Sequence, residues 1–224
     1  MTVAAVILAS QADLALRDVD GVANVRRLAD TAWAGGALPI VVVAPDPDGA
    51  VAVALAGTPA VLAAPPEGGG AASEAARGID VARAEVDGTD AVLLWPARMG
   101  WVDAETVTTL IEAHGTDRPA ILRPSYGGEP GWPALVPAAQ AEAVRAQAPA
   151  RALPELLAAL TSAGVASRLV EVGDPGAVHD LDTPGEDLPP FEGPPEPPPE
   201  RQHEWGSPAA AGPDEAPDPA RAAV

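Results

Sequence analysis

The chain has 224 residues, which suits one domain of ordinary size followed by a tail and is enough to bury a substantial core. It carries 32 acidic and 13 basic residues, for a formal net charge of -19, which argues against binding to nucleic acid or to an anionic membrane surface. Cysteine is absent, so disulfides, thiolate metal sites and cysteine nucleophiles are excluded.

The N-terminal segment reads as a first strand. Residues 1–10 contain no basic residue, and their apolar run is too short to span a bilayer. We therefore expect neither a signal peptide nor a membrane anchor here, and we expect a cytoplasmic protein.

Strands and helices alternate along the first part of the chain. Strands are predicted at residues 3–9, 39–44, 60–64, 90–95 and 120–123, and the first two are uninterrupted apolar runs, typical of strands buried on both faces of a parallel sheet. Helical spacing of apolar residues predicts helices over 21–35, 49–56, 72–83 and 103–114. Asp103 is the expected N-cap of the last of these helices, and His114 lies at its end, where a cation suits the helix dipole.

The regular alternation of strands and helices changes after Pro124. A turn-rich insertion over 126–133 precedes a short strand at 134–136, helices at 138–146 and 153–163, and a final strand at 167–172. These elements predict one three-layer α/β/α sandwich over residues 1–188, with a mostly parallel, Rossmann-like sheet. Residues 189–224 are rich in proline and acids, and we expect an acidic disordered tail in which Phe191 and Trp205 could dock a protein partner.

The stretch over residues 93–107, LLWPARMGWVDAETV, passes from an apolar strand through a loop into a helix. Open α/β sheets bind ligands at the carboxyl ends of their strands, so this loop is a candidate ligand site. Trp95, Trp101 and Trp132 could line one crevice there, or they could be ordinary packing residues.

Several segments, in order, resemble the MobA-like NTP-transferase family of molybdenum-cofactor nucleotidyltransferases. The ending VEVGDPGAVHDLDTPGEDL, residues 170–188, is similar to the family's closing strand and its D-x-D-T-P-x-D motif, with Gly185 as an additional residue. The opening AAVILA, residues 4–9, resembles the first strand of the family. This resemblance implies a nucleotide-diphospho-sugar-transferase-like fold and a nucleotide or small phosphorylated ligand.

The loop after the first strand departs from that family pattern. The family carries a glycine-rich signature and a lysine there, which wrap and neutralise a triphosphate, whereas this chain has Ser10-Gln11-Ala12-Asp13 and no lysine anywhere. A triphosphate needs close backbone N–H groups and at least one cation. Arg17 could supply the cation, but acidic residues surround it.

Arg98 occupies the position at which the resemblance implies a metal-binding aspartate. Exchanging a carboxylate for a guanidinium opposes a divalent cation, because two unit charges about 4 Å apart interact by roughly 4 kcal/mol at an effective dielectric near 20. Arg98 could instead grip a phosphate, or it could be salt-bridged with Asp180 or Asp182.

One further segment matches the family more loosely, and His179 marks a possible cation site. GGGAASEAARGI, residues 68–79, resembles the Gly and Ser motif that borders the nucleotide base, so Gly70 and Ser73 could donate hydrogen bonds to a base, or the glycines could simply form a turn. His179 lies beside Asp180 and Asp182 in a possible cation site, although a capped turn explains it equally. The candidate nucleotide-binding residues are thus Ala9, Ser10, Gly70, Ser73 and Arg98, and the candidate metal ligands, for Mg²⁺ in an active enzyme, are Asp180 and Asp182.

Three functions remain open. The chain could be a family member with a degenerate active site that acts in binding or regulation. It could be an active transferase that moves a nucleotidyl group to a molybdopterin-type or phosphorylated acceptor, with Arg17 and Arg98 handling phosphates. It could also be an interaction scaffold that works through its tail.

Overall fold

The computed structural model describes residues 1–194, and this part forms a layered α/β domain. Its main sheet has eight strands in the order β10-β7-β9-β6-β1-β4-β5, with β8 paired to β7, and β2 and β3 form a separate hairpin. The strands are β1 (Val3–Leu8), β2 (Asp18–Val19), β3 (Val22–Ala23), β4 (Ile40–Val43), β5 (Ala60–Ala63), β6 (Ala91–Pro96), β7 (Ile121–Tyr126), β8 (Glu129–Pro130), β9 (Ala134–Pro137) and β10 (Ser167–Glu171).

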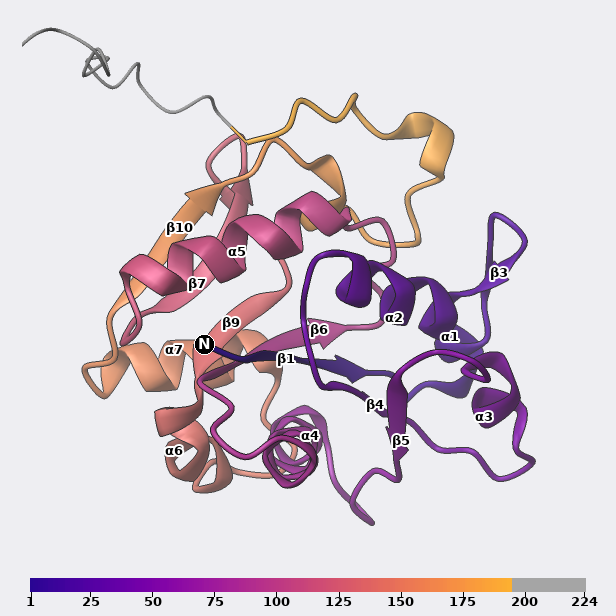
Figure 1. The fold of residues 1–224 in the computed structure, drawn as a ribbon, viewed down its shortest axis with the longest axis horizontal. Helices are drawn as coiled ribbons and strands as arrows, with labels where there is room; N and C mark the ends of the chain where they lie inside the picture. Colours follow the sequence, from indigo (N-terminus) through magenta and orange to yellow (C-terminus); the bar gives the residue numbers. More distant parts are fainter. Residues whose placement is uncertain (195–224) are drawn as a thin grey trace, which may run out of the picture.

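Helices cover both faces of the main sheet. They are α1 (Ala12–Ala15), α2 (Asn24–Ala34), α3 (Ala50–Ala54), α4 (Ala71–Glu85), α5 (Ala104–Thr116), α6 (Ala141–Arg145) and α7 (Leu153–Ser162), with short 3-10 turns at Ala138–Gln140, Pro175–Ala177 and Gly185–Asp187. Figure 1 shows α2 and α5 on one side of the sheet and α4, α6 and α7 on the other. The predicted three-layer sandwich is therefore confirmed.

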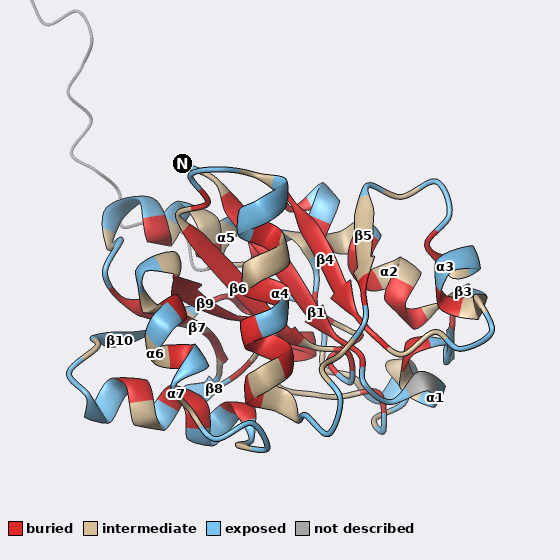
Figure 2. Cartoon of the chain, turned by 90° about the horizontal axis from the view of Figure 1, so that it is seen from below, coloured by how far each residue is buried: buried red, intermediate tan, exposed pale blue. Residues whose placement is uncertain are grey.

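The central strands are buried on both faces, as Figure 2 shows in red. Alternate residues of β1 contribute to two separate clusters: Ala5 and Ile7 pack with α2 and α5, while Ala4 and Val6 pack with α4 and α7. This double burial explains why the strand sequences read as uninterrupted apolar runs. β1 pairs in parallel with both β4 and β6, so their carboxyl ends open toward the same edge.

Glycines let two helices approach their neighbours closely. A Cβ added at Gly78 in α4 would lie 2.1 Å from Cγ1 of Val6 in β1, and one at Gly35 would lie 2.4 Å from Cβ of Val107 in α5. Neither space admits a side chain, so the layers sit at the short separation that a core of small aliphatic residues requires.

The predicted elements are confirmed, with boundaries that move by a few residues. Three details differ. The insertion after Pro124 extends β7 to Tyr126 and turns at Gly127 and Gly128, both at positive φ, into β8. β9 runs antiparallel to β6. The small hairpin of β2 and β3 was not predicted, because its sequence contains no apolar run.

His114 does not act as an exposed cation at a helix end. The residue is 1% exposed, α5 continues past it to Thr116, and neither ring nitrogen has a hydrogen-bond partner in the described part of the chain. Burial lowers the pKa of His114, which favours the neutral ring. His114 therefore lies in the last turn of α5 as expected, but its burial favours the neutral ring over the cation.

The described chain ends close to β10. The backbone N–H of Glu192 donates to the carbonyl of Gly173 at 2.9 Å, so the first residues of the predicted tail contact the domain. Phe191 is 45% exposed, and the rest of that prediction, including Trp205, falls on residues 195–224, outside the described chain. Of the helices within residues 1–194, none has the length and apolar character needed to cross a membrane.

Candidate functional site

A cavity of about 450 Å³ opens at the carboxyl ends of β1 and β6. Its volume lies within the range of ordinary small-molecule sites. The loops after these strands form its walls, together with the first turn of α4 and the C-terminal segment around residue 181. Its polar and charged lining consists of Ser10, Gln11, Asp13, Arg17, Glu74, Arg98, Asp180 and Asp182.

The loop after β1 folds into the single turn of α1. The backbone N–H groups of Leu14 and Ala15 donate to the carbonyl of Gln11, and that of Ala9 donates to Val43 in β4. These donors are already satisfied within the protein. The loop contains no glycine, so it does not match the glycine-rich loops that surround phosphates with backbone N–H groups.

Asn24, at the start of α2, joins the two loops that form the cavity. Its Nδ2 donates to the carbonyl of Leu14 at 3.1 Å and to that of Ala97 at 2.7 Å, and the residue is completely buried. Its Oδ1 has no partner among the described residues, and a Cβ at Gly100 would lie 2.6 Å from it. Asn24 thus positions the loops that carry Arg17 and Arg98 without contacting the cavity itself.

Arg98 forms the ion pair that was one of its two expected roles. Its Nη2 donates to the Asp180 carboxylate and lies 3.7 Å from Oδ2 of Asp182, while Asp182 also lies 3.5 Å from Nη1 of Arg17. The side chain of Arg98 remains 57% exposed and that of Asp182 77% exposed. Both are screened by solvent, so the contacts can open at little cost when a ligand competes.

These residues do not fit a divalent cation. The guanidinium of Arg98 lies against the two carboxylates that were the candidate metal ligands, so a divalent cation bound there would be repelled by Arg98 as it is placed in this structure. In residues 1–194, no group of three or more His, Asp or Glu side chains is arranged to hold a metal. His179, the third candidate for such a group, does not line the cavity.

Glu74 forms part of the cavity wall and was not among the sequence candidates. The residue is 6% exposed, and its Oε2 accepts a hydrogen bond from the hydroxyl of Ser10. A glutamate in the first turn of a helix is ordinarily interpreted as a solvated residue whose negative charge interacts favourably with the helix dipole. No sequence signal marks it as buried.

The predicted nucleotide-binding residues divide into two groups. Ala9, Ser10 and Arg98 line the cavity together with Asp180 and Asp182. Gly70 and Ser73 do not: the N–H of Gly70 donates to Oγ of Ser73, whose hydroxyl donates back to the Gly70 carbonyl. A Cβ at Gly70 would lie 2.8 Å from Cα of Ala150, so the protein's own chain covers this turn.

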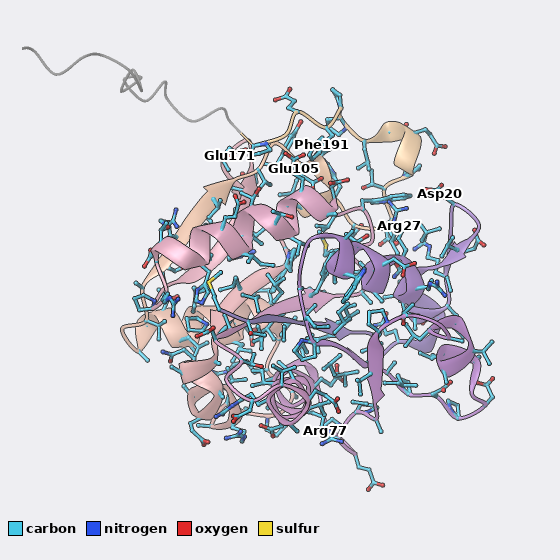
Figure 3. All side chains as sticks on the ribbon, viewed as in Figure 1. Asp20, Arg27, Arg77, Glu105, Glu171 and Phe191 are labelled. Atoms are coloured by element: carbon cyan, nitrogen blue, oxygen red, sulfur yellow. The ribbon has the colours of Figure 1, made fainter. Side chains whose placement is uncertain are left out.

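The three tryptophans do not share a crevice. Trp95 is completely buried and donates its indole N–H to the Met99 carbonyl at 3.0 Å. Trp101 lies under the guanidinium of Arg27, which also approaches Asp20 in the β2–β3 turn, and both charged residues are labelled in Figure 3. Trp132 lies under Arg123 instead, and none of the three lines the cavity. They serve packing, and the crevice expectation is wrong.

The sheet order, the two helical layers and a cavity at the strand ends define a nucleotidyltransferase-like fold. The model of the MobA-like NTP transferase domain matches residues 10–167, so the chain belongs to that family. No curated protein matches the sequence.

Solved structures agree on the fold. A nucleotidyl transferase from Methanothermobacter superposes with a TM-score of 0.62 at 18% identity, covering 76% of this chain and 87% of its own. A Mycobacterium tuberculosis protein in complex with manganese superposes with a TM-score of 0.60 at 19% identity, covering 77% of this chain and 88% of its own. The 4-diphosphocytidyl-2C-methyl-D-erythritol synthase from Anaerococcus prevotii superposes with a TM-score of 0.63 at 12% identity, covering 83% of this chain and 92% of its own.

Proposed function

We propose that this chain keeps the nucleotidyltransferase scaffold as a ligand-binding or regulatory protein and does not transfer nucleotidyl groups by the family's metal-dependent route. The observation that carries the proposal is the Arg98 guanidinium placed against Asp180 and Asp182. Family resemblance implies a metal-binding carboxylate at the position of Arg98. An internal cation there takes up the carboxylates that a metal would need.

The loop after β1 supports the same proposal. It contains no glycine to bring its backbone close to a phosphate, and the chain contains no lysine to balance charge on a leaving pyrophosphate. Four carboxylates and two guanidiniums line the cavity, so its charge balance disfavours a triphosphate.

Calorimetry on the full chain with CTP, GTP and ATP, each with and without Mg²⁺, tests the proposal when paired with an assay for pyrophosphate release. We expect no pyrophosphate and no gain in affinity from Mg²⁺. Micromolar binding that depends on Mg²⁺, or any NTP-dependent pyrophosphate release, would overturn it.

An active transferase with a rewired site is the second candidate. It is favoured by the exposure of Arg17 and Arg98 beside a cavity of ligand size, where both could meet phosphates. Asp180 and Asp182 would then hold Mg²⁺, and the acceptor would be a molybdopterin-type or other phosphorylated compound. Pyrophosphate release that disappears in Asp182→Asn would support this candidate.

Two broader expectations also remain proposals. A cytoplasmic location fits the family. Capture of a protein partner through residues 189–224 is tested by deleting that segment, and unchanged capture by the shortened chain would rule this role out.

A further inference from the structure

Glu74 is a buried carboxylate without a cation beside it. Asp180 and Asp182, which line the same cavity, pair with Arg17 and Arg98, whereas Glu74 has no salt bridge in the described part of the chain. Burying a carboxyl group without a counter-charge costs solvation, and such a group in a cavity wall is a candidate functional residue. The N-terminal dipole of α4 offsets only part of this cost.

The hydrogen bonds of Glu74 leave one of its oxygens free. Oε2 accepts from the Ser10 hydroxyl, but Oε1 has no hydrogen-bond partner within residues 1–194. A carboxylate oxygen accepts and cannot donate when ionised. Because Glu74 lines the cavity, a bound molecule can supply the donor that the protein does not.

The other polar side of the cavity has the opposite character. Arg17 and Arg98 expose 43% and 57% of their side chains and present planar forks of N–H donors, which match phosphate oxygens. With no lysine nearby and four acids in the lining, the site suits one phosphate group better than three.

We propose that the cavity binds a small phosphate monoester that also carries an amino group, with Glu74 accepting from the N–H donors and Arg17 and Arg98 holding the phosphate. Glu74 is then the residue that determines specificity. An amino group suits it better than a hydroxyl because N–H groups bearing positive or partial positive charge offset the buried carboxylate. This inference rests on the binding role proposed above and adds the ligand's chemistry to it.

Two sources of such a ligand exist, and matched pairs separate them. CMP and UMP differ by an amino group on the base, and phosphoethanolamine and glycerol phosphate differ by an ammonium on a small ester. Calorimetry on the full chain in EDTA should show, in one pair, about tenfold tighter binding of the amino compound. The pair that responds identifies the source as a nucleotide or as a small amino-phosphate.

Glu74→Gln tests the assigned residue, since it keeps the shape of the side chain and removes its charge. We expect the preference for the amino compound to fall about tenfold, to near unity. Glu85→Gln is the matched control, because Glu85 is exposed at the other end of α4. Ser10→Ala, which leaves the carboxylate in place, should retain the preference, and circular dichroism melting curves check that each variant is folded.

The outcomes separate this inference from the proposed function. Pyrophosphate release with any NTP would overturn the binding-only role. The preference for the amino compound, and its loss in Glu74→Gln, would still test whether Glu74 determines specificity. Equal affinities within both pairs, no binding of any of the four compounds, or an unchanged preference in Glu74→Gln would each overturn the assignment of Glu74.

Discussion

The guanidinium of Arg98 donates to the carboxylate of Asp180, although 82 positions separate the two residues in the sequence. Arg98 follows β6, and Asp180 belongs to the C-terminal segment, so the contact joins two walls of the cavity. Both side chains are partly exposed, and such pairs contribute little to stability. The main effect of this ion pair is on the charge of the ligands that the cavity can bind.

Arg98→Asp should create a divalent-cation site at Asp180 and Asp182. The change removes the guanidinium and adds a third carboxylate beside Asp180 and Asp182, and oxygen ligands of this kind suit Mg²⁺ and Mn²⁺. Titration with Mn²⁺ followed by calorimetry or electron spin resonance should show binding in the variant only. Arg83→Asp, on the exposed face of α4, is the charge-matched control. Equal Mn²⁺ binding by the natural chain would contradict the ion-pair explanation.

Asp182→Asn should strengthen the binding of a phosphate monoester. Asp182 faces both Arg17 and Arg98 and therefore competes with an incoming anion for the same two cations. The side chain is largely exposed, so we expect a gain of about two- to fivefold, which corresponds to roughly 1 kcal/mol or less. Calorimetry with CMP and with phosphoethanolamine measures it, and Asp187→Asn is an exposed control from the same segment. Weaker binding would instead indicate that Asp182 holds a metal or the ligand.

His114→Leu should remove a component of acid sensitivity. Burial keeps the pKa of His114 below its ordinary value of 6.5, with smaller effects from Asp90, Asp117 and Arg118. Since the folded-state pKa is the lower one, this group's stabilising contribution is present above pH 6.5 and is lost as pH falls through the folded-state pKa. Both ring nitrogens lack partners, so leucine gives up no hydrogen bond.

Thermal melts of the two proteins between pH 8 and pH 5 provide the measurement. The variant should melt at least as high as the natural chain at pH 7 and should lose less of its melting temperature toward pH 5. A variant that loses as much as the natural chain would show that His114 does not contribute to acid sensitivity.

Gly78→Ala and Gly115→Ala should have effects of opposite sign. The new methyl group at Gly78 would lie 2.1 Å from Cγ1 of Val6 and must push α4 away from β1, which costs about 1–3 kcal/mol. The one at Gly115 meets nothing closer than 3.9 Å, and alanine is the better helix former by up to ~1 kcal/mol. Urea unfolding of both variants compares the free energies of unfolding directly, and similar values for both would argue against close packing of α4 on β1.

Much of the fold was predictable because its strands are buried on both faces. Runs such as those of β1 and β6 leave few alternatives to a parallel sheet covered by helices. Asp103 was also predictable as an N-cap, and it accepts from the N–H of Glu105. The direction of β9 was not, since a short buried run looks alike in parallel and antiparallel pairing.

The site was predictable only where residues follow strand ends or repeat a known motif. Arg98, Asp180 and Asp182 met one of these conditions, and their pairing was among the expected alternatives. Glu74 lies within the loosely matched segment 68–79 but is neither its Gly nor its Ser, and Asn24 met neither condition; polar residues in a first helical turn are usually solvated. Their burial depends on the loops that fold over them, which local sequence does not specify.

The indole of Trp95 fixes the loop that carries Arg98, since its N–H holds the Met99 carbonyl from inside the core. Loop shape is then set by packing that exists before any ligand arrives. Binding at this wall of the cavity need not order a flexible segment, so it avoids that entropic loss and leaves no slow closing step to limit association. A small phosphorylated molecule that binds as proposed would therefore exchange rapidly.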